Sequence, residues 1–246
     1  MGRLLFLLIA GLLLACHNDE KRAGLWLSFD DRSINQWYEL RDLLRTDNVY
    51  VTFFITQPDS LTKEEVDKLL KLQQDGHEIG FHGSQHVLSE YYIKENSYTE
   101  YLKDEIESGL NTMEKLGFEC TSFAYPYGAK YWFTDLILFQ KFDILRGVAP
   151  LNKEKDISKI DEVYYSFNGD CTLFSFGFDN NSGVTDDMLE KAMDRAAGRN
   201  EVLMLYAHAP VSSDKKGYVF NLKTLKFIIS KAKASDLEFY TSKNLR

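Results

Sequence analysis

Short apolar runs alternate with amphipathic segments along nearly the whole 246-residue chain, and this alternation limits the folds open to it more than any other feature. Strict alternation of strands and helices predicts a parallel sheet, and this many units favour an α/β barrel. Residues 157–169 give no clear pattern. The predicted strands are 24–31, 49–56, 78–81, 120–125, 143–148, 173–178, 202–206 and 237–240, and the predicted helices are 36–45, 62–75, 97–116, 133–142, 186–199 and 222–234.

Length and charge narrow the possibilities further. A chain of this size with 44% hydrophobic residues can bury one sizeable core, and it contains no internal repeat, low-complexity tract or Pro/Gly-rich linker. Its formal net charge is −8, and no basic cluster interrupts that balance. A single domain is therefore expected, and a nucleic-acid partner is not.

The N-terminus is typical of an exported protein. Arg3 precedes an apolar stretch at residues 4–14 that is too short to span a bilayer, so residues 1–15 are predicted to be a signal peptide. The following Leu13-Leu14-Ala15-Cys16 resembles a bacterial lipobox. It implies a lipid on Cys16, a tether over residues 16–23, and an extracytoplasmic, membrane-anchored lipoprotein. The alternative is an ordinary signal peptide in which Cys16 is incidental.

Two further cysteines follow the leader. An oxidising compartment would permit Cys120 and Cys171 to pair, but the sequence does not show whether they meet.

The first predicted strand ends in two adjacent carboxylates, Asp30 and Asp31. Like charges at the end of a buried strand destabilise each other unless a cation lies between them. His82 and His86 stand four residues apart after another predicted strand, and one carboxylate with two imidazoles makes an open metal site of the kind used for hydrolysis. A solvated Asp pair in a turn and an incidental His pair are the alternatives.

Three segments together resemble a known family. SFDD at residues 28–31, VTFFIT at 51–56 and DGHEIGFHGSQH at 75–86 are similar, in order and spacing, to the polysaccharide deacetylases with a NodB-homology domain, also called carbohydrate esterase family four. The resemblance extends over roughly residues 25–208. It implies a distorted (β/α) TIM-like barrel of about seven units, with residues 24–246 as the catalytic domain.

The resemblance also implies roles for single residues. Asp30 matches the family's catalytic base, and Asp31, His82 and His86 match ligands of a divalent metal ion, for which zinc is the first choice. His208, after the apolar run at 202–206, matches the general acid. A core histidine with a backbone partner is the alternative for His208.

Substrate contacts are predicted from the same comparison. The backbone amide of Tyr127, after Pro126, would help to hold the oxyanion, and Tyr125 and Leu205 would line the substrate site. Leu205 would also be apolar as an ordinary core residue. The tyrosines, together with Tyr131 and Trp132, could stack on sugar rings, although plain packing accounts for them as well.

Two positions depart from the family. Ala124 stands where the family has an arginine that pairs with the catalytic aspartate, and Arg146, at the end of another predicted strand, is a candidate replacement. The family's aspartate that orients the acid histidine is not recognisable, and Asp179 is its best substitute. A surface arginine and a solvated loop aspartate are the alternatives.

These features predict a metal-dependent hydrolase that removes acetyl groups, from nitrogen rather than oxygen, from an extracytoplasmic carbohydrate such as an N-acetylglucosamine-containing glycan. A catalytically inactive, sugar-binding lipoprotein on the same scaffold is the alternative from another class. A two-His, one-carboxylate iron oxygenase has the same ligand set, but the predicted parallel barrel and the second aspartate argue against it.

Overall fold

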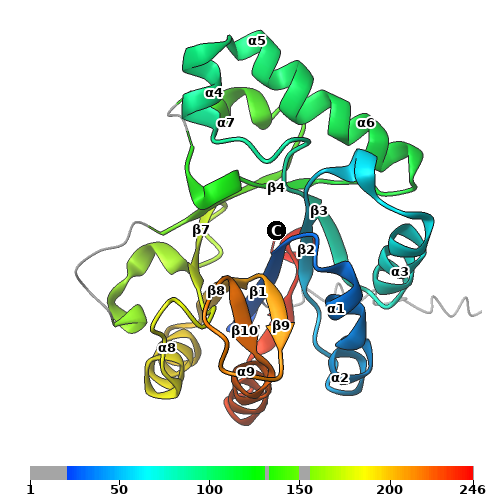
Figure 1. Ribbon diagram of the computed structural model, residues 1–246. Coiled ribbons are helices and arrows are strands. Elements are labelled where there is room, and N and C mark those ends of the chain that lie inside the picture. Colours follow the sequence, from blue (N-terminus) through cyan, green and yellow to red (C-terminus); the bar gives the residue numbers. More distant parts are fainter. Residues whose placement is uncertain (1–20, 131–132, 150–155, 246) are drawn as a thin grey trace, which may run out of the picture.

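The computed structural model describes residues 21–130, 133–149 and 156–245 (Figure 1). In this part of the chain, seven parallel strands form a closed barrel, because the first strand pairs with the last through the register Leu25 to Leu203. In order around the barrel, the strands are β1 (Gly24–Asp31), β2 (Thr52–Ile55), β3 (Glu78–Phe81), β4 (Ser122–Ala124), β5 (Ile144–Val148), β7 (Thr172–Gly177) and β8 (Val202–Ala207). The predicted distorted barrel is confirmed.

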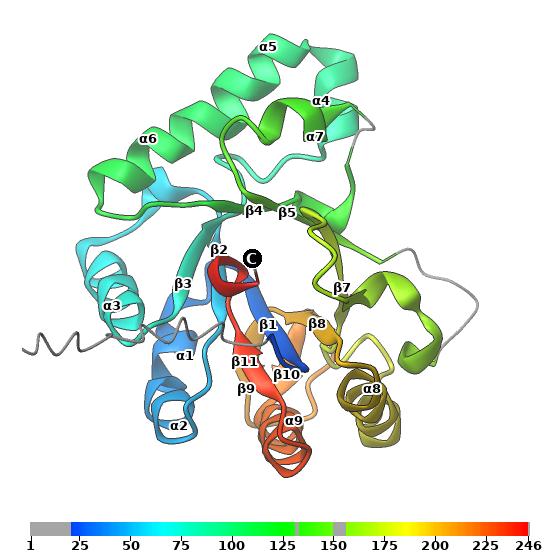
Figure 2. The ribbon, with the colours of Figure 1, turned by 180° about the vertical axis from the view of Figure 1, so that it is seen from behind.

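Helices surround the strands on the outside (Figures 1 and 2). A capping box formed by Thr62 and Glu65 begins α3, where the Thr62 side chain accepts from the Glu65 amide. The helices are α1 (Ile34–Glu39), α2 (Arg41–Thr46), α3 (Lys63–Gln74), α4 (Ser89–Glu95), α5 (Tyr98–Tyr101), α6 (Ser108–Lys115), α7 (Thr134–Leu138), α8 (Asp186–Arg199) and α9 (Leu222–Ala234).

Strand alternation divides the apolar residues into two cores. Along β1, Leu25, Leu27 and Phe29 belong to the large cluster beneath the helices. Trp26 belongs to the smaller cluster inside the barrel, and Asp30 shares its side of the strand. The middle of the interior is therefore a packed apolar core, and the interior becomes polar towards the carboxyl ends of the strands.

The amino-terminal end of the barrel is closed by the end of the chain. The strand β11 (Glu238–Tyr240) pairs with the start of β1, and the 3₁₀ turn η6 (Ser242–Asn244) then crosses the barrel opening (Figure 2). The buried carboxylate of Glu78 accepts hydrogen bonds from the Ser242 amide at 2.7 Å and hydroxyl at 2.6 Å, the Ser122 hydroxyl at 2.7 Å and the Thr52 hydroxyl at 3.0 Å. These bonds fasten the C-terminus to three barrel strands.

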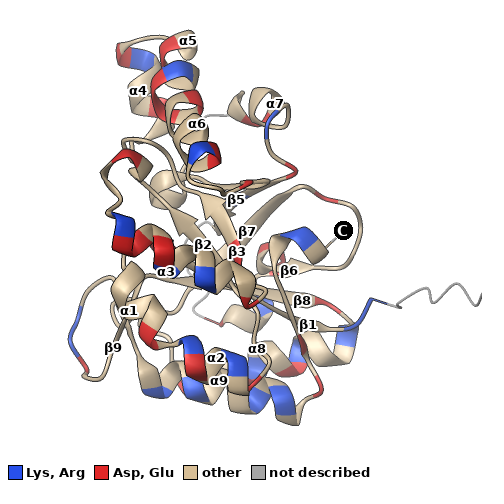
Figure 3. Ribbon diagram, turned by 90° about the vertical axis from the view of Figure 1, so that its right-hand side faces the viewer, with Lys and Arg blue, Asp and Glu red and all other residues tan. Residues whose placement is uncertain are grey.

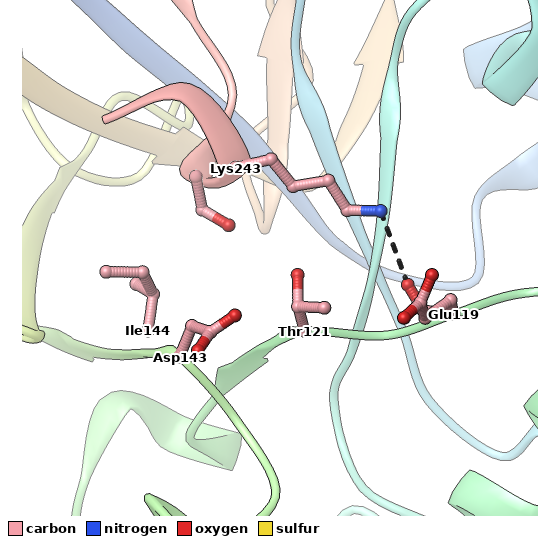
Figure 4. A pocket seen from close by; sticks show the side chains of 6 residues that line it. Glu119, Thr121, Asp143, Ile144 and Lys243 are labelled. Carbon is pink, nitrogen blue, oxygen red and sulfur yellow. Dashed lines mark hydrogen bonds between the residues drawn. The ribbon is translucent and has the colours of Figure 1, made fainter. Parts of the chain in front are cut away.

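A pocket of about 290 Å³ lies beside this closure (Figure 4). Thr121 and Asp143 line it from the starts of β4 and β5, and Lys243 reaches across to the Glu119 carbonyl at 3.5 Å. The pocket is thus at the opposite end of the barrel from the strand ends that carry Asp31.

The segment predicted as one helix over 97–116 is interrupted. A π-helical turn, η2 (Leu102–Glu107), separates α5 from α6. The chain also contains elements that the sequence patterns did not predict. These are α4, the short strand β6 (Tyr164–Tyr165), which pairs antiparallel with β8, and a separate two-stranded sheet of β9 (Ala209–Val211) and β10 (Val219–Asn221). The predicted helix 36–45 is divided into α1 and α2 at Leu40.

Cys120 and Cys171 are not joined by a disulfide. Cys120 packs in the core beneath the helices, whereas Cys171 packs against the cluster inside the barrel, so the two side chains lie in different apolar clusters. In the described residues, no helix is both long and apolar enough to cross a bilayer. Lysine and arginine alternate with acidic residues on the outer helices, as on α3 (Figure 3).

Candidate active site

The polar residues singled out in the sequence gather at the carboxyl ends of the barrel strands. Asp30 and Asp31 end β1, His82 directly follows β3, and His208 directly follows β8. Active sites of α/β barrels lie on this face, because the loops after the strands are free to vary there.

Three side chains present their ligand atoms to one point. One ligand atom each from Asp31, His82 and His86 lies within 4.8 Å of the others. The Nε2 atoms of the two histidines are 3.2 Å apart, and the Asp31 Oδ1 atom lies 3.3 Å from the Nε2 of His86 and 3.6 Å from that of His82. Two imidazole nitrogens and a carboxylate oxygen in this arrangement are a donor set that can hold a divalent metal ion.

The buried His82 is oriented for such a role. Its Nδ1 lies 2.8 Å from the Ala124 carbonyl oxygen, so Nδ1 carries the proton and Nε2 keeps its lone pair. Burial lowers the pKa of His82 to about 4, although the Asp30 and Asp31 carboxylates oppose this effect. A neutral imidazole with Nε2 free to donate its lone pair fits a divalent cation.

Asp30 is held by Arg146 inside the barrel. The Arg146 guanidinium donates to the Asp30 Oδ2 atom, and both side chains are almost fully buried. Burial alone would raise the pKa of Asp30, but Arg146 and the nearby histidines hold it below the usual value. The Asp30 Oδ1 atom has no hydrogen-bond partner among the described residues. One oxygen is therefore fixed, and the other is available to a water or a substrate.

The register explains how Arg146 reaches Asp30. Ala124 on β4 pairs directly with Arg146 on β5, so the arginine occupies the neighbouring position on the next strand. Its guanidinium also stacks over the rings of Phe54 and Tyr206, at 5.3 and 5.0 Å. The structure thus places a guanidinium beside Asp30 although the family's arginine is absent from position 124.

Asp179 orients His208. Its Oδ2 atom accepts from the His208 Nδ1 at 2.6 Å, and its Oδ1 atom accepts from the His208 backbone amide at 3.1 Å. Burial lowers the pKa of His208, but the hydrogen bond to Asp179 and the carboxylates of Asp30 and Asp31 outweigh it and leave the pKa above its ordinary value. The His208 Nε2 then faces Asp31, at 3.9 Å from its Oδ2.

The backbone around the site departs from ordinary strand and loop conformations. Asp31, His86 and Tyr127 all have positive φ, at 84°, 60° and 60°. Non-glycine residues rarely adopt this region, and such strain often accompanies functional sites. The Tyr127 ring is largely exposed and lies 4.8 Å from the His86 ring, so this residue does border the site.

Two predicted substrate contacts are wrong. The Tyr125 ring is fully buried and its hydroxyl donates to Asp135 at 2.6 Å, so it cannot meet a sugar. Leu205 is also fully buried and belongs to the cluster beneath the helices. Both errors have the same cause: alternate residues of a strand point to opposite sides, and these two point away from the barrel interior.

Sequence reasoning missed two residues near the site. The exposed ring of Tyr218 lies 5.2 Å from the His208 ring, and it comes from the segment between β9 and β10 that was not predicted. Glu105 is fully buried behind His86. It falls four residues after Tyr101 and four before Gly109, so a carboxylate on the apolar face of the predicted helix was a signal available in the sequence. Burial raises the pKa of Glu105 to about 7, although backbone amides lower it.

Some predicted features lie outside the described residues. These are the signal peptide at 1–15, Cys16 with most of its tether, and the aromatic pair Tyr131 and Trp132. His77, which matches no ligand position, is buried near the start of β3, where its Nδ1 accepts from the Val51 amide at 3.3 Å.

Comparison with known proteins places the chain among the deacetylases. Residues 17–138, about half of the chain, match the family described as polysaccharide deacetylase. The matched segment contains Asp30, Asp31, His82 and His86 but ends before His208. A search of curated proteins found no significant sequence match.

Several solved structures share the fold. The catalytic domain of a peptidoglycan N-acetylglucosamine deacetylase from Eubacterium rectale is similar with a TM-score of 0.57 and 14% identity, covering 92% of this chain and 90% of that one. The peptidoglycan N-acetylglucosamine deacetylase Bc1960 gives 0.60 and 17%, covering 91% and 88%. The chitin deacetylase of the fungus Colletotrichum lindemuthianum gives 0.61 and 12%, covering 92% and 88%.

Proposed function

Since the chain belongs to the polysaccharide deacetylase family, and is an enzyme of that class, we propose that it hydrolyses N-acetyl groups of an amino-sugar glycan with the help of a divalent metal ion. The observation that carries this proposal is the convergence of Asp31, His82 and His86 beside a carboxylate and an imidazole that are each held by a charged partner. The solved relatives named for peptidoglycan N-acetylglucosamine and for chitin support nitrogen-linked acetyl groups as the substrate class.

The metal would be held by Asp31, His82 and His86, and the nitrogen and oxygen donors favour zinc. It would act as a Lewis acid on the acetyl carbonyl. The neutral state of His82 and the hydrogen bond from its Nδ1 to the Ala124 carbonyl support this donor set, because the hydrogen bond fixes the ring with its Nε2 towards the ligand cluster.

Asp30 would act as the general base. Arg146 engages its Oδ2, which leaves Oδ1 to take the proton from the attacking water. The low pKa that Arg146 imposes keeps Asp30 ionised at neutral pH, so it can accept that proton. The Tyr127 backbone amide would help to hold the oxyanion.

His208 would act as the general acid. Its Nδ1 is occupied by Asp179, so the proton for the leaving nitrogen comes from Nε2, the atom that faces Asp31. The carboxylates of Asp179, Asp30 and Asp31 hold the pKa of His208 above the ordinary histidine value, which favours the protonated form that a general acid needs. The pair resembles the carboxylate and histidine of other hydrolases, in which the carboxylate orients the ring.

Acetate release tests this proposal. The purified protein should release acetate from at least one member of a panel of N-acetylated glycans, including chitin oligosaccharides and peptidoglycan, and a chelator should stop the release until zinc is restored. Release that survives exhaustive chelation would contradict the metal proposal. No release from any acetylated glycan, by protein that binds metal, would favour the inactive sugar-binding alternative.

The contacts of Arg146 and Asp179 weigh against that alternative. The idea of an inactive protein rested on the loss of two family motifs, and each lost charge has a substitute in contact with the expected partner.

We also propose export and a lipid anchor at Cys16, from the leader sequence alone. Replacing Cys16 with serine should move the protein out of the membrane fraction or block removal of the leader. Unchanged fractionation and processing of Cys16→Ser would mean that no lipid is attached.

A further inference from the structure

Behind the proposed metal ligands lies a buried carboxylate that the mechanism does not use. Glu105 is completely shielded from solvent, and within the described residues its carboxylate bonds to backbone amides and forms no ion pair with a lysine or arginine. A buried carboxylate without a cation is stable only where hydrogen-bond donors surround it. The groups that donate hydrogen bonds to the Glu105 carboxylate therefore indicate its role.

Its donors all belong to the loop that carries His86. The Gln85 amide donates to one carboxylate oxygen at 2.6 Å, and the Val87 amide donates to the other at 3.0 Å. The two hydrogen bonds therefore fasten the backbone on both sides of His86. A residue held in this way cannot turn about its own backbone, and His86 needs this because its φ of 60° is unfavourable for histidine.

A second set of contacts ties the same loop to the same helical segment. The Glu105 carbonyl accepts from the Ser84 amide and from the Ser84 hydroxyl, both at 2.9 Å, and that hydroxyl accepts from the Gly109 amide at 2.8 Å. The π-helical turn η2 contains Glu105, and such turns often mark functional positions in helices. The carbonyl of Glu105 is thus directed to the loop as well as its side chain.

The loop is shaped to receive the carboxylate. Gly83 has a φ of 89°, and a Cβ atom there would lie only 2.0 Å from a carboxylate oxygen of Glu105. A glycine is required for both reasons. The loop from 83 to 87 and the Glu105 carboxylate therefore fit each other too closely for either to change alone.

We propose that Glu105 is a positioning residue that fixes the 83–87 loop, so that the His86 imidazole stays opposite His82 and Asp31 before any metal arrives. The proposal rests on the proposed metal site. It predicts that the loss of Glu105 weakens metal binding, because the cation would then have to order the loop itself.

The test compares two buried carboxylates in matched variants. Glu105→Gln keeps the size of the side chain but offers one acceptor oxygen to two amide donors. Glu78→Gln is the control, because Glu78 is also a buried carboxylate that accepts hydrogen bonds from the surrounding chain, but it lies at the other end of the barrel. Zinc affinity is measured by competition with a chelating dye, far below the melting temperature of each variant, and the Co²⁺ absorption spectrum reports the ligand geometry.

Glu105→Gln should bind zinc about tenfold more weakly than the wild type, the lower end of what outer contacts of metal sites contribute. Its Co²⁺ spectrum should change, and its acetate release should recover as the zinc concentration rises. Glu78→Gln should lose thermal stability yet bind zinc with unchanged affinity. Equal zinc affinity in wild type and Glu105→Gln would overturn the proposal. It would mean that Glu105 contributes to the stability of the fold and not to metal binding.

Two further outcomes remain decisive. If Glu105→Gln does not fold, Ser84→Ala replaces it. That change removes only the hydroxyl that donates to the Glu105 carbonyl and accepts from the Gly109 amide, and it should weaken zinc binding about fivefold. Unaltered zinc affinity in Ser84→Ala would then overturn the proposal. If the wild type itself binds no metal, it is the proposed function that fails.

Discussion

The two ends of the barrel differ in how their buried charged groups are hydrogen-bonded. At the amino-terminal end, the buried Glu78 carboxylate is surrounded by donors from Ser242, Ser122 and Thr52, and the chain closes the opening. At the carboxyl end, Asp30 and Arg146 each keep a buried polar atom without a partner among the described residues, and the neighbouring backbone is strained. The Glu78 carboxylate is therefore saturated with hydrogen-bond donors, whereas Asp30 keeps one oxygen that a water or a substrate can use.

The largest loss of function is expected when the metal ligands at the carboxyl end of the barrel are removed. The double variant His82→Ala, His86→Ala removes two of three donors, so it should carry almost no metal and release no acetate. The wild type should carry close to one divalent ion per chain. Metal analysis of the two purified proteins checks this, and equal metal content would refute the ligand assignment.

Variants of the two proposed proton-transfer residues should lose turnover but keep the metal ion. Asp30→Asn and His208→Ala should each lower kcat by about 10² to 10⁴, the usual contribution of general acid–base catalysis, while metal content stays near normal. Steady-state kinetics with parallel metal analysis is the measurement. A variant that loses its metal would show that the residue is a ligand and that the roles were assigned wrongly.

Arg146→Met should have a smaller effect with a characteristic pH signature. Asp30 must be ionised to act as a base, so activity falls as the pH drops through its pKa. Without the guanidinium that pKa rises, and the acid limb of the kcat profile should move to higher pH while kcat falls. Stability should also fall, because Asp30 is left buried without its partner.

The register offers a direct control for Arg146. Since Ala124 is its neighbour on β4, the double variant Ala124→Arg, Arg146→Ala returns the charge to the strand where the family has it. Partial recovery of the acid limb would show that the charge matters more than the strand that supplies it. Wild-type kinetics in Arg146→Met would show that the site needs no replacement for the family's arginine.

Asp179→Asn should change the alkaline limb of the pH–activity profile. The hydrogen bond to Asp179 is the main influence that raises the pKa of His208 against the effect of burial. His208 must be protonated to act as an acid, so activity falls as the pH rises through its pKa. The variant should therefore move the alkaline limb to lower pH. An alkaline limb that stays in place would assign that limb to another group.

The smallest effect on activity is expected at the closed end. Ser242→Ala removes the hydroxyl that donates to Glu78 at 2.6 Å, and the free energy of unfolding should fall by about 1 kcal/mol, the usual net worth of a hydrogen bond. Turnover and metal content should not change. A marked loss of kcat in this variant would show that the two ends are coupled and that their roles are not separate.

The barrel and the metal cluster were predictable because their signals are local. Alternating strand and helix patterns fixed the parallel barrel, and β1, β3, α8 and α9 have the predicted boundaries. Asp31, His82 and His86 meet because each follows a strand, and parallel strands end at the same rim of a barrel.

What sequence reasoning could not supply depends on side-chain direction and on long-range contacts. Tyr125 and Leu205 were assigned to the substrate because they lie near motifs, but only the register shows that they point to the helices. Arg146 was left undecided for the same reason. The position of Glu105 on the apolar face of the predicted helix was visible in the sequence, but the π-helical turn that contains Glu105 and its contact with the His86 loop were not.

The place where the described chain begins bears on which way the enzyme would face in the cell envelope. Arg22 pairs with Glu238 at 2.9 Å beside the start of β1, at the closed end of the barrel. Five residues lead from Cys16 to Lys21, and an extended chain of that length reaches at most about 18 Å. A lipid on Cys16 would therefore hold the closed end next to the bilayer and turn Asp31 outwards.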